Sequence, residues 1–283
     1  MNQITPIFAA DCVFQTLRKI GDPLFAGTAN GWNGGAEESE VDLHAVVGDF
    51  FDAGLSRAGI STGDRVFYVG GMSMAQTDWL STLVGDCGEL VVGEAAVNVD
   101  EAIALTPDGA DQATFDAVYS AFGTMSFESP VAGLRTLRRM LKPGGRMTQV
   151  VWREAKANPW ISTAATVARR HLPVSNATPV AGDPFAMADR YMVEAQMSAA
   201  GFENVNFERV DQKIWIAEDF EAAVDFQMNL SPARELISEA GVLAAVVVPH
   251  IRERLLEELS PYETEDGVWM DASAWIVTGE NPT

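Results

Sequence analysis

Four short apolar runs, separated by turns and helical segments, most constrain how this chain folds. They lie at residues 65–69, 89–93, 115–119 and 146–152. Runs of this length, rich in β-branched and aromatic residues and bounded by Gly and Asp, are typical of buried strands. Strands that alternate with helices pair in parallel, because each crossover returns the chain to the same end of the sheet. The sequence therefore predicts an α/β fold with a doubly wound, mainly parallel sheet.

Beyond Trp152 the pattern changes to longer helical stretches. Helices are predicted within 153–172 and 218–259, and another in "DPFAMADRYMVEAQMSAAGF". The stretch "NVNFERVDQKIWI" resembles a β-hairpin-like pair. We also expect the sheet to carry an antiparallel end, formed by residues 205–216 and 268–278.

No internal repeat, charge block or low-complexity linker divides the chain. We therefore expect a mostly helical N-terminal segment over 1–62 and one α/β domain over 63–283. Helical insertions are expected at 153–200 and 217–262, where they cap the sheet.

A large excess of acidic residues limits the partners of this protein. There are 40 Asp and Glu against 19 Lys and Arg, which gives a formal net charge of −21. Such a charge repels nucleic acid phosphates and anionic membrane surfaces. The longest apolar run, 241–250, is too short to span a bilayer. We expect neither nucleic acid nor a membrane as a partner.

Metal chemistry and disulfides are also disfavoured by the sequence. Cys12 and Cys87 show no metal-ligand spacing and cannot form a disulfide framework. The histidines at 44, 171 and 250 occur singly in helical segments, which favours packing or surface roles over catalysis. The N-terminus lacks the pattern of a secretory signal. We expect a reduced, cytoplasmic protein without a bound metal.

Three stretches carry a resemblance to a known family: "FDAVYSAFGTMSFESPVAGLRTLRRMLKPGGRMTQVVWREAKANPW", "DPFAMADRYMVEAQMSAAGFENV" and "SPYETEDGVWMDASAWIVTG". They resemble the ubiquinone/menaquinone-type class I SAM-dependent methyltransferases, which act on small molecules. The likeness covers roughly residues 40–283. It implies a Rossmann-like fold, SAM as the cofactor and a small-molecule ligand.

The first strand and its turn depart from that family. There the strand ends in an acidic residue followed by a GxGxG turn that packs against SAM. In this chain the acid corresponds to Tyr68, Gly70 keeps its place beside Gly71, and the later glycines correspond to Met72 and Met74. A side chain is sterically costly at a turn that needs positive φ or touches the ligand. We therefore expect SAM to bind weakly or not at all.

The resemblance offers two acidic residues on the adenosine side, Glu94 and Glu101. The family acid that accepts the ribose hydroxyls falls on Ala95, one residue after Glu94. Because side chains alternate along a strand, this shift turns Glu94 away unless the strand ends or bulges there. Glu101, followed by Ala102, matches the pair that contacts adenine.

The spacing after the second strand is short. Only twenty residues separate Glu94 from Phe115, whereas the family places a crossover helix, a strand and a connection in that interval. The full set does not fit. We expect the helix to be missing, with residues 96–102 as a candidate third strand.

On the opposite side of the expected site, several apolar residues follow the fourth and fifth strands. By family likeness Phe122 lies against the cofactor, and Met125, Phe127 and Trp160 against the substrate. Packing in the core is the alternative for all four, and also the simplest interpretation of the other tryptophans at 79, 152, 215, 269 and 275. The substrate-side residues are expected to line an apolar pocket at the carboxyl ends of the strands.

Four functions remain open from the sequence. The first is a methyltransferase-like protein that acts on a small, largely apolar molecule with weakened or lost SAM binding. The second is a non-methylating enzyme of cyclase or lyase type on the same fold. The third is a non-catalytic methyltransferase-like partner of an active relative, and the fourth is a small-ligand binding protein. Catalytic residues cannot be named, and both a homodimer and a heteromer with an active relative remain open.

Overall fold

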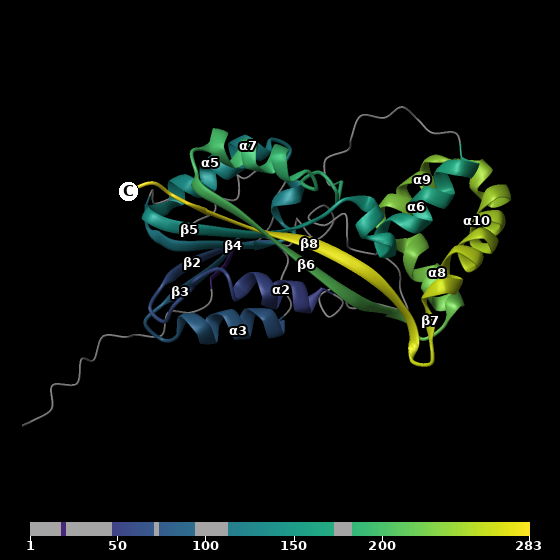
Figure 1. Cartoon of the computed structure of the whole chain (residues 1–283), viewed down its shortest axis with the longest axis horizontal. Helices are drawn as coiled ribbons and strands as arrows, with labels where there is room; N and C mark the ends of the chain where they lie inside the picture. Colours follow the sequence, from purple (N-terminus) through teal and green to yellow (C-terminus); the bar gives the residue numbers. More distant parts are fainter. Residues whose placement is uncertain (1–17, 21–46, 71–73, 94–112, 173–182) are drawn as a thin grey trace, which may run out of the picture.

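The computed structural model describes residues 18–20, 47–70, 74–93, 113–172 and 183–283. Within them the strands form one mixed sheet in the order β1-β3-β2-β4-β5-β8-β6, with β7 paired to β8 (Figure 1). The strands are β1 (Arg18–Ile20), β2 (Arg65–Val69), β3 (Glu89–Gly93), β4 (Phe115–Ala121), β5 (Leu141–Trp152), β6 (Glu203–Ala217), β7 (Glu263–Thr264) and β8 (Gly267–Glu280).

The first five strands in this order are parallel, and β8 is antiparallel to both of its long neighbours, β5 and β6. Strands β2 and β3 are buried along nearly their whole length, as expected for central strands covered on both faces. Strand β6 lies at the edge, and exposed residues recur along most of its length. The predicted mainly parallel α/β fold is confirmed.

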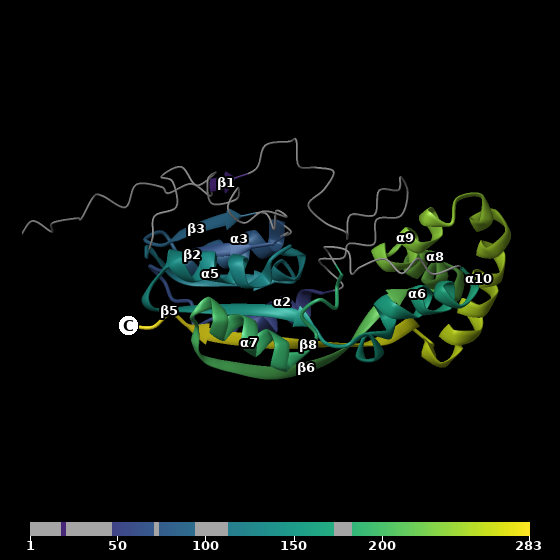
Figure 2. The same ribbon diagram turned by 90° about the horizontal axis from the view of Figure 1, so that it is seen from above.

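Helices cover both faces of the sheet and extend it at one end. Figure 1 shows α2 and α3 on one face and α5 and α7 on the other. The remaining helices gather in a helical lobe beyond the sheet, as the turned view shows (Figure 2). The helices with more than one turn are α2 (Gly48–Leu55), α3 (Met74–Val84), α5 (Pro130–Met140), α6 (Pro159–His171), α7 (Arg190–Ala200), α8 (Phe220–Asn229), α9 (Ser231–Glu239) and α10 (Ala244–Leu259).

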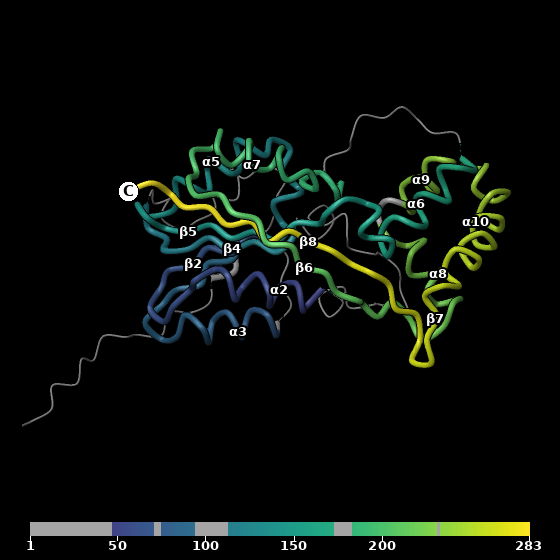
Figure 3. Tube along the Cα trace, viewed as in Figure 1, coloured from purple at the N-terminus to yellow at the C-terminus, as the bar shows by residue number. Residues whose placement is uncertain are grey.

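The helical lobe, formed by α6, α8, α9 and α10, is joined to the sheet by the long pair β6 and β8. The Cα trace in Figure 3 shows this pair running from the sheet to the lobe. The lobe has its own apolar interior, to which α6 contributes Trp160 and Ile161 and α10 contributes Leu255 and Leu259, all fully buried. The helices therefore stand at the end of the sheet where β4 and β5 finish.

One local prediction from the sequence needs correction. The stretch "NVNFERVDQKIWI" forms no hairpin: it is part of the single strand β6, which pairs with β8 along its length. Within the N-terminal segment, residues 18–20 form strand β1, parallel to β3, and its mostly helical character stays a prediction. Short apolar runs discriminate poorly between helix and strand, and pairing with a distant strand decides the outcome. The candidate third strand at 96–102 lies outside the described residues.

Helix α2 packs unusually close to the sheet at Gly54. A Cβ added there would lie 2.3 Å from Cγ2 of Val150 and 2.7 Å from the hydroxyl oxygen of Tyr119. Neither neighbour moves easily, since both are fully buried and the Tyr119 hydroxyl donates a hydrogen bond to the carbonyl of Phe51. The absence of a side chain at this position lets the phenylalanines of α2 reach the strands.

This contact yields a first prediction. Gly54→Ala should lower the free energy of unfolding by about 1–3 kcal/mol, because the added methyl overpacks the interface. Gly48→Ala in the same helix is the matched control, since a Cβ there meets nothing within 4 Å. The control should be neutral or slightly stabilising, as alanine favours the helix. Chemical denaturation of both variants tests the contact, and equal stabilities would contradict it.

Candidate functional site

The strand order reverses between β2 and β4, which is where a doubly wound sheet opens a crevice for a ligand. In this structure the two strand ends approach closely. A Cβ on Gly123, just beyond β4, would lie 2.4 Å from the carbonyl oxygen of Val69 and 2.9 Å from Cα of Gly70. Gly70 has a φ of +137°, which glycine adopts readily and other residues do not. The end of β2 therefore leaves no room for a side chain at Gly123.

Tyr68 fills the space next to Gly70. Its side chain is fully buried, and it shares a hydrogen bond with the backbone of Ala121. A Cβ on Gly70 would lie 3.2 Å from the Tyr68 hydroxyl oxygen. Burial raises the pKa of Tyr68, because the phenolate would lose its hydration, and the bond with Ala121 only partly offsets this. A neutral phenol thus stands at the carboxyl end of β2.

Four aromatic side chains meet at the carboxyl ends of β4 and β5, and together they form what we call the aromatic cluster. The Phe122 ring stacks on Trp152, with 4.0 Å between ring centroids and 17° between planes. Trp152 also meets Phe50 of α2 at 5.1 Å and Trp160 of α6 at 5.4 Å, both edge to face. The cluster joins the sheet, helix α2 and the helical lobe at one point.

Two polar atoms at the aromatic cluster have no hydrogen-bond partner among the residues that the structure describes. They are the hydroxyl oxygen of Thr124 and the indole nitrogen of Trp152, whose side chains are almost completely buried. Most buried polar groups in folded proteins are paired, so an unpaired one calls for an explanation. Thr124 opens the short helix after β4, and Trp152 is the last residue of β5.

The predicted substrate-side residues are all buried, but they do not all meet. The sulfur of Met125 lies 3.5 Å from the backbone nitrogen of Trp152, and Trp160 contacts the Trp152 ring. Phe127 lies instead against α5, where a Cβ on Gly133 would come within 2.4 Å of its ring. Two of the three therefore converge on the aromatic cluster, and the apolar pocket stays a prediction.

Of the predicted cofactor-side residues, the structure describes two. Gly70 and Phe122 lie at the neighbouring ends of β2 and β4, as expected. Gly71, Glu94 and Glu101 lie outside the described residues. The core interpretation of the tryptophans is wrong for Trp79 and Trp215, which are 42% and 41% exposed. The Trp79 ring contacts the Phe51 ring. The Trp215 indole nitrogen donates a hydrogen bond to the carbonyl of Asp266.

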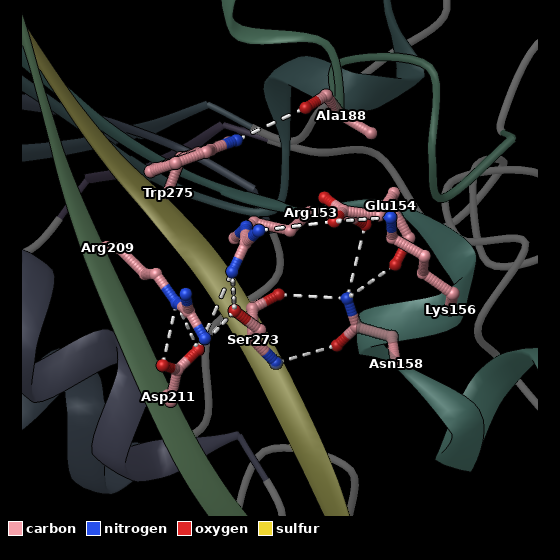
Figure 4. Close-up of polar contacts among 9 residues, drawn as sticks. All are labelled: Arg153, Glu154, Lys156, Asn158, Ala188, Arg209, Asp211, Ser273 and Trp275. Carbon is pink, nitrogen blue, oxygen red and sulfur yellow. Dashed lines mark hydrogen bonds and ion pairs between the residues drawn. The ribbon is translucent and has the colours of Figure 1, made fainter.

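A polar network ties the loop after β5 to β8 (Figure 4). The side chain of Asn158 is fully buried. Its amide nitrogen donates to the carbonyls of Ser273 at 2.9 Å and Arg153 at 3.1 Å, and its amide oxygen accepts from the backbone nitrogen of Ser273 at 2.9 Å. The sequence singled out Asn158 only for its place after the fifth strand, and its partner Ser273 is 115 positions away. No local pattern signals such a pairing.

The network continues toward the edge strand through charged groups. Arg153 donates to the Ser273 hydroxyl at 3.1 Å and lies over the Trp275 ring, 4.7 Å from its centroid (Figure 4). The Ser273 hydroxyl donates to Asp211 at 2.6 Å. A hydrogen bond from Arg209 lowers the pKa of Asp211, assisted by Ser273 and Arg153. These charges satisfy one another, so the network holds the base of the helical lobe and offers no free reactive group.

The described residues contain no group of three or more His, Cys, Asp or Glu side chains placed to hold a metal ion. The two described histidines, His171 and His250, are exposed on α6 and α10. None of the helices in the described ranges combines the length and apolarity of a membrane crossing. At the strand ends the aromatic cluster is buried except for part of Phe122.

Comparison with protein families gives one match. The family described as "Methyltransferase domain" matches residues 77–148, from within α3 to within β5. Among curated proteins no match is found. The family match and the sheet order together support a methyltransferase-type fold.

Solved structures resemble the chain only distantly. A Bacillus halodurans C-125 protein assigned as a methyltransferase shares 14% identity at a TM-score of 0.46, covering 82% of this chain and 99% of its own. The YcgJ protein from Bacillus subtilis shares 11% identity at 0.47, covering 85% of this chain and 99% of its own. The cyclase SpnF shares 18% identity at 0.40, covering 89% and 86% respectively. At these values no functional conclusion follows from the likeness.

The burial of Tyr68 yields a second prediction. Tyr68→Phe should lower the free energy of unfolding by about 1 kcal/mol at neutral pH, through loss of the bond to Ala121. Because the folded pKa is raised, this tyrosine contributes stability below its ordinary pKa of about 10 and loses it as the pH rises through the folded value. The variant should therefore lose less stability than the wild type above pH ~10.

Urea unfolding between neutral and alkaline pH measures this effect. Tyr191→Phe is the control, since that side chain is 76% exposed and should leave the pH profile unchanged. An identical alkaline slope in the Tyr68→Phe protein and the wild type would show that Tyr68 is not buried as described.

The polar network yields a third prediction. Asn158→Ala should lower the free energy of unfolding by about 1–3 kcal/mol, because it leaves the buried backbone N–H of Ser273 without its partner. Amide hydrogen exchange should become faster at the start of α6. Asn229→Ala, at the exposed end of α8, should change stability by less than about 0.5 kcal/mol. Unchanged exchange in α6 would contradict the role given to Asn158.

Proposed function

We propose that this protein acts on a small, largely apolar molecule at the carboxyl ends of β4 and β5, on a methyltransferase-type fold whose SAM binding is weakened or lost. The observation that carries this proposal is the packing at the reversal of strand order. There the end of β2 leaves no room for a side chain at Gly123, and the fully buried Tyr68 occupies the position that the resemblance gives to the family's acid.

The cofactor side has lost several contacts that the family uses. A backbone or ribose hydrogen bond contributes about 1 kcal/mol, and a charge-assisted one about 1.5–3 kcal/mol. Each 1.4 kcal/mol corresponds to about a tenfold change in affinity. Loss of the acid at Tyr68 and of the glycines at Met72 and Met74 therefore moves a micromolar ligand toward millimolar affinity.

The substrate side is supported by a different set of residues. The aromatic cluster lies at the edge where open α/β sheets bind their ligands, and Phe122 is its partly exposed member. Methyl transfer from SAM depends mainly on positioning, so the lack of a described base does not argue against it. The buried phenol of Tyr68 affects the cofactor side and leaves the aromatic cluster in place.

That contrast favours a second candidate function, a non-methylating enzyme of cyclase or lyase type. Such an enzyme would use the aromatic cluster without needing SAM. A non-catalytic partner of an active methyltransferase, in a homodimer or a heteromer, would also keep the fold while losing the cofactor. Both alternatives predict the same weak binding of SAM, and they differ in whether the chain alone converts a substrate.

Isothermal titration with SAM and with S-adenosylhomocysteine tests the proposal as a fourth prediction. The wild-type protein should bind both with dissociation constants near millimolar or not detectably. The double change Met72→Gly with Met74→Gly should recover little affinity, because Tyr68 still stands in the place of the acid. Low-micromolar binding of SAM to the wild type would contradict the proposal and restore an ordinary methyltransferase function.

A further inference from the structure

Strand β6 forms one edge of the sheet, and no described strand lies beyond it. It is hydrogen-bonded to β8 alone, and Figure 2 shows it as the outermost ribbon on its side. Residues 206–215, which we call the edge stretch, keep one register with β8, because the irregularities lie at Glu203/Asn206 and Trp215/Ala217. The edge stretch contains neither proline nor glycine. Its outward backbone N–H and C=O groups can therefore pair with another chain.

The charge of the edge stretch differs from that of the whole chain. It carries two acidic residues, Glu208 and Asp211, and two basic ones, Arg209 and Lys213, which sum to zero, whereas the formal net charge of the chain is −21. Two copies of so acidic a protein repel each other, and a neutral strip is where they can approach. A basic partner would gain more from the acidic surface elsewhere. The edge stretch therefore fits a second copy of this chain.

The order of residues in the edge stretch is complementary to itself. When two copies pair antiparallel about a two-fold axis at Val210, residues equally far before and after Val210 face each other. Arg209 then faces the partner's Asp211, and Asp211 faces the partner's Arg209. Both side chains are about half exposed, at 57% and 49%, and their present contact is with each other, at 2.7 Å. Across the axis the four charges alternate in sign, which favours the pair.

The next positions on the same face also match. Side chains alternate along a strand, so Phe207 and Lys213 share the face of Arg209. In the antiparallel pair Phe207 lies opposite the partner's Lys213, a cation beside an aromatic ring. At the end of the paired stretch, Trp215 comes next to the partner's Val205. Trp215 is 41% exposed, and Val205 is only partly buried, so both have apolar surface left to cover.

Charge also disfavours the neighbouring registers. A shift of the axis by one residue in one direction places Arg209 opposite the partner's Arg209. The same shift in the other direction places Asp211 opposite the partner's Asp211. Like charges directly opposite each other destabilise a strand pair. The two-fold axis at Val210 is therefore favoured over both of its neighbours.

We propose that β6 pairs antiparallel with β6 of a second copy of this chain, about a two-fold axis at Val210, so that the two sheets form one continuous sheet. In each copy β6 runs from the sheet toward the helical lobe (Figure 3). Antiparallel pairing consequently sends the two lobes to opposite ends of the dimer. This inference goes beyond the proposed function and does not rest on it, because neither SAM nor a substrate takes part.

The fifth prediction is read by sedimentation equilibrium. The wild type should have twice the chain mass of 30.5 kDa. Arg209→Asp places acids on both sides of the axis and should raise the dissociation constant of the dimer at least about tenfold. Asp211→Arg should do the same with bases. Arg169→Asp is the matched control: it makes the same change in net charge at an exposed position on α6, and it should leave the dimer intact.

Mixing the two weakened variants tests the register itself. In a dimer of one Arg209→Asp chain with one Asp211→Arg chain, every acid faces a base again. The mixture should therefore form a one-to-one dimer although neither variant dimerises alone. Because Asp211 also accepts a hydrogen bond from Ser273, circular dichroism must show that the Asp211→Arg chain is folded.

A cysteine at the axis gives an independent test that leaves these charges in place. Cys12 and Cys87 are first replaced by serine. Val210→Cys should then form a disulfide-linked dimer on air oxidation catalysed by copper phenanthroline, because residue 210 faces its own copy across the axis. Gln212→Cys, on the same face of β6, is the control, since it faces the partner's Glu208 and should form little cross-linked dimer.

Four results would overturn the inference. The first is a wild type that stays monomeric throughout the micromolar range, even where it binds another protein or peptide along β6. The second is an Arg209→Asp chain that dimerises as tightly as the wild type. The third is a mixture of two folded weakened variants that forms no dimer. The fourth, which also decides the matter if Asp211→Arg does not fold, is cross-linking of Gln212→Cys as readily as of Val210→Cys. Tight SAM binding would overturn the proposed function and leave all four readouts unaffected.

Discussion

The close approach of the backbones at Gly70 and Gly123 is the constraint on which the site depends. At a reversal of strand order the connections leave on opposite faces of the sheet, and ligands bind outside the carboxyl ends of the strands there. Here the end of β2 leaves no room for a side chain at Gly123, and the Tyr68 hydroxyl lies next to Gly70. An ionised acid could not replace Tyr68 without burying an unpaired charge. Tyr68 is therefore a packing position.

On the substrate side, by contrast, the structure contains a strained residue and buried polar atoms. Phe122 keeps an unfavourable backbone conformation, and Thr124 and Trp152 keep polar atoms without a described partner, at the carboxyl ends of β4 and β5. Each of these features costs folding free energy, and valine in place of Thr124 would remove one of them. The polar network around Asn158 and Ser273 fixes the base of the helical lobe beside this strained region.

Much of the fold was readable from the sequence because the central strands are short, apolar and bounded by turns. Strands β2 and β3 begin and end as predicted, since nearly every one of their residues is buried and the pattern is unbroken. The single strand β6 was misread as a hairpin, because its pairing with β8 is set by residues some fifty or more positions away. Strand β1 occupies the sheet edge beside β3, which the N-terminal pattern did not indicate.

The candidate site was only partly readable. The replacements at Tyr68, Met72 and Met74 follow from the resemblance, and Phe122 was placed near the site by the same route. The left-handed backbone of Phe122 and the touching glycines depend on how two strand ends meet, which one-dimensional patterns do not encode. The isolation of the Thr124 and Trp152 polar atoms likewise arises only from packing between strands and helices that are distant in sequence.

The most direct test of the packing around Tyr68 and Gly70 is a crystal structure of the protein grown with a large excess of S-adenosylhomocysteine. The account predicts that Tyr68 keeps its bond with the Ala121 backbone, that Gly70 and Gly123 stay in contact, and that no adenosyl group is ordered between β2 and β4. An adenosyl ligand packed against Gly70, with Tyr68 displaced or accepting the ribose, would contradict it.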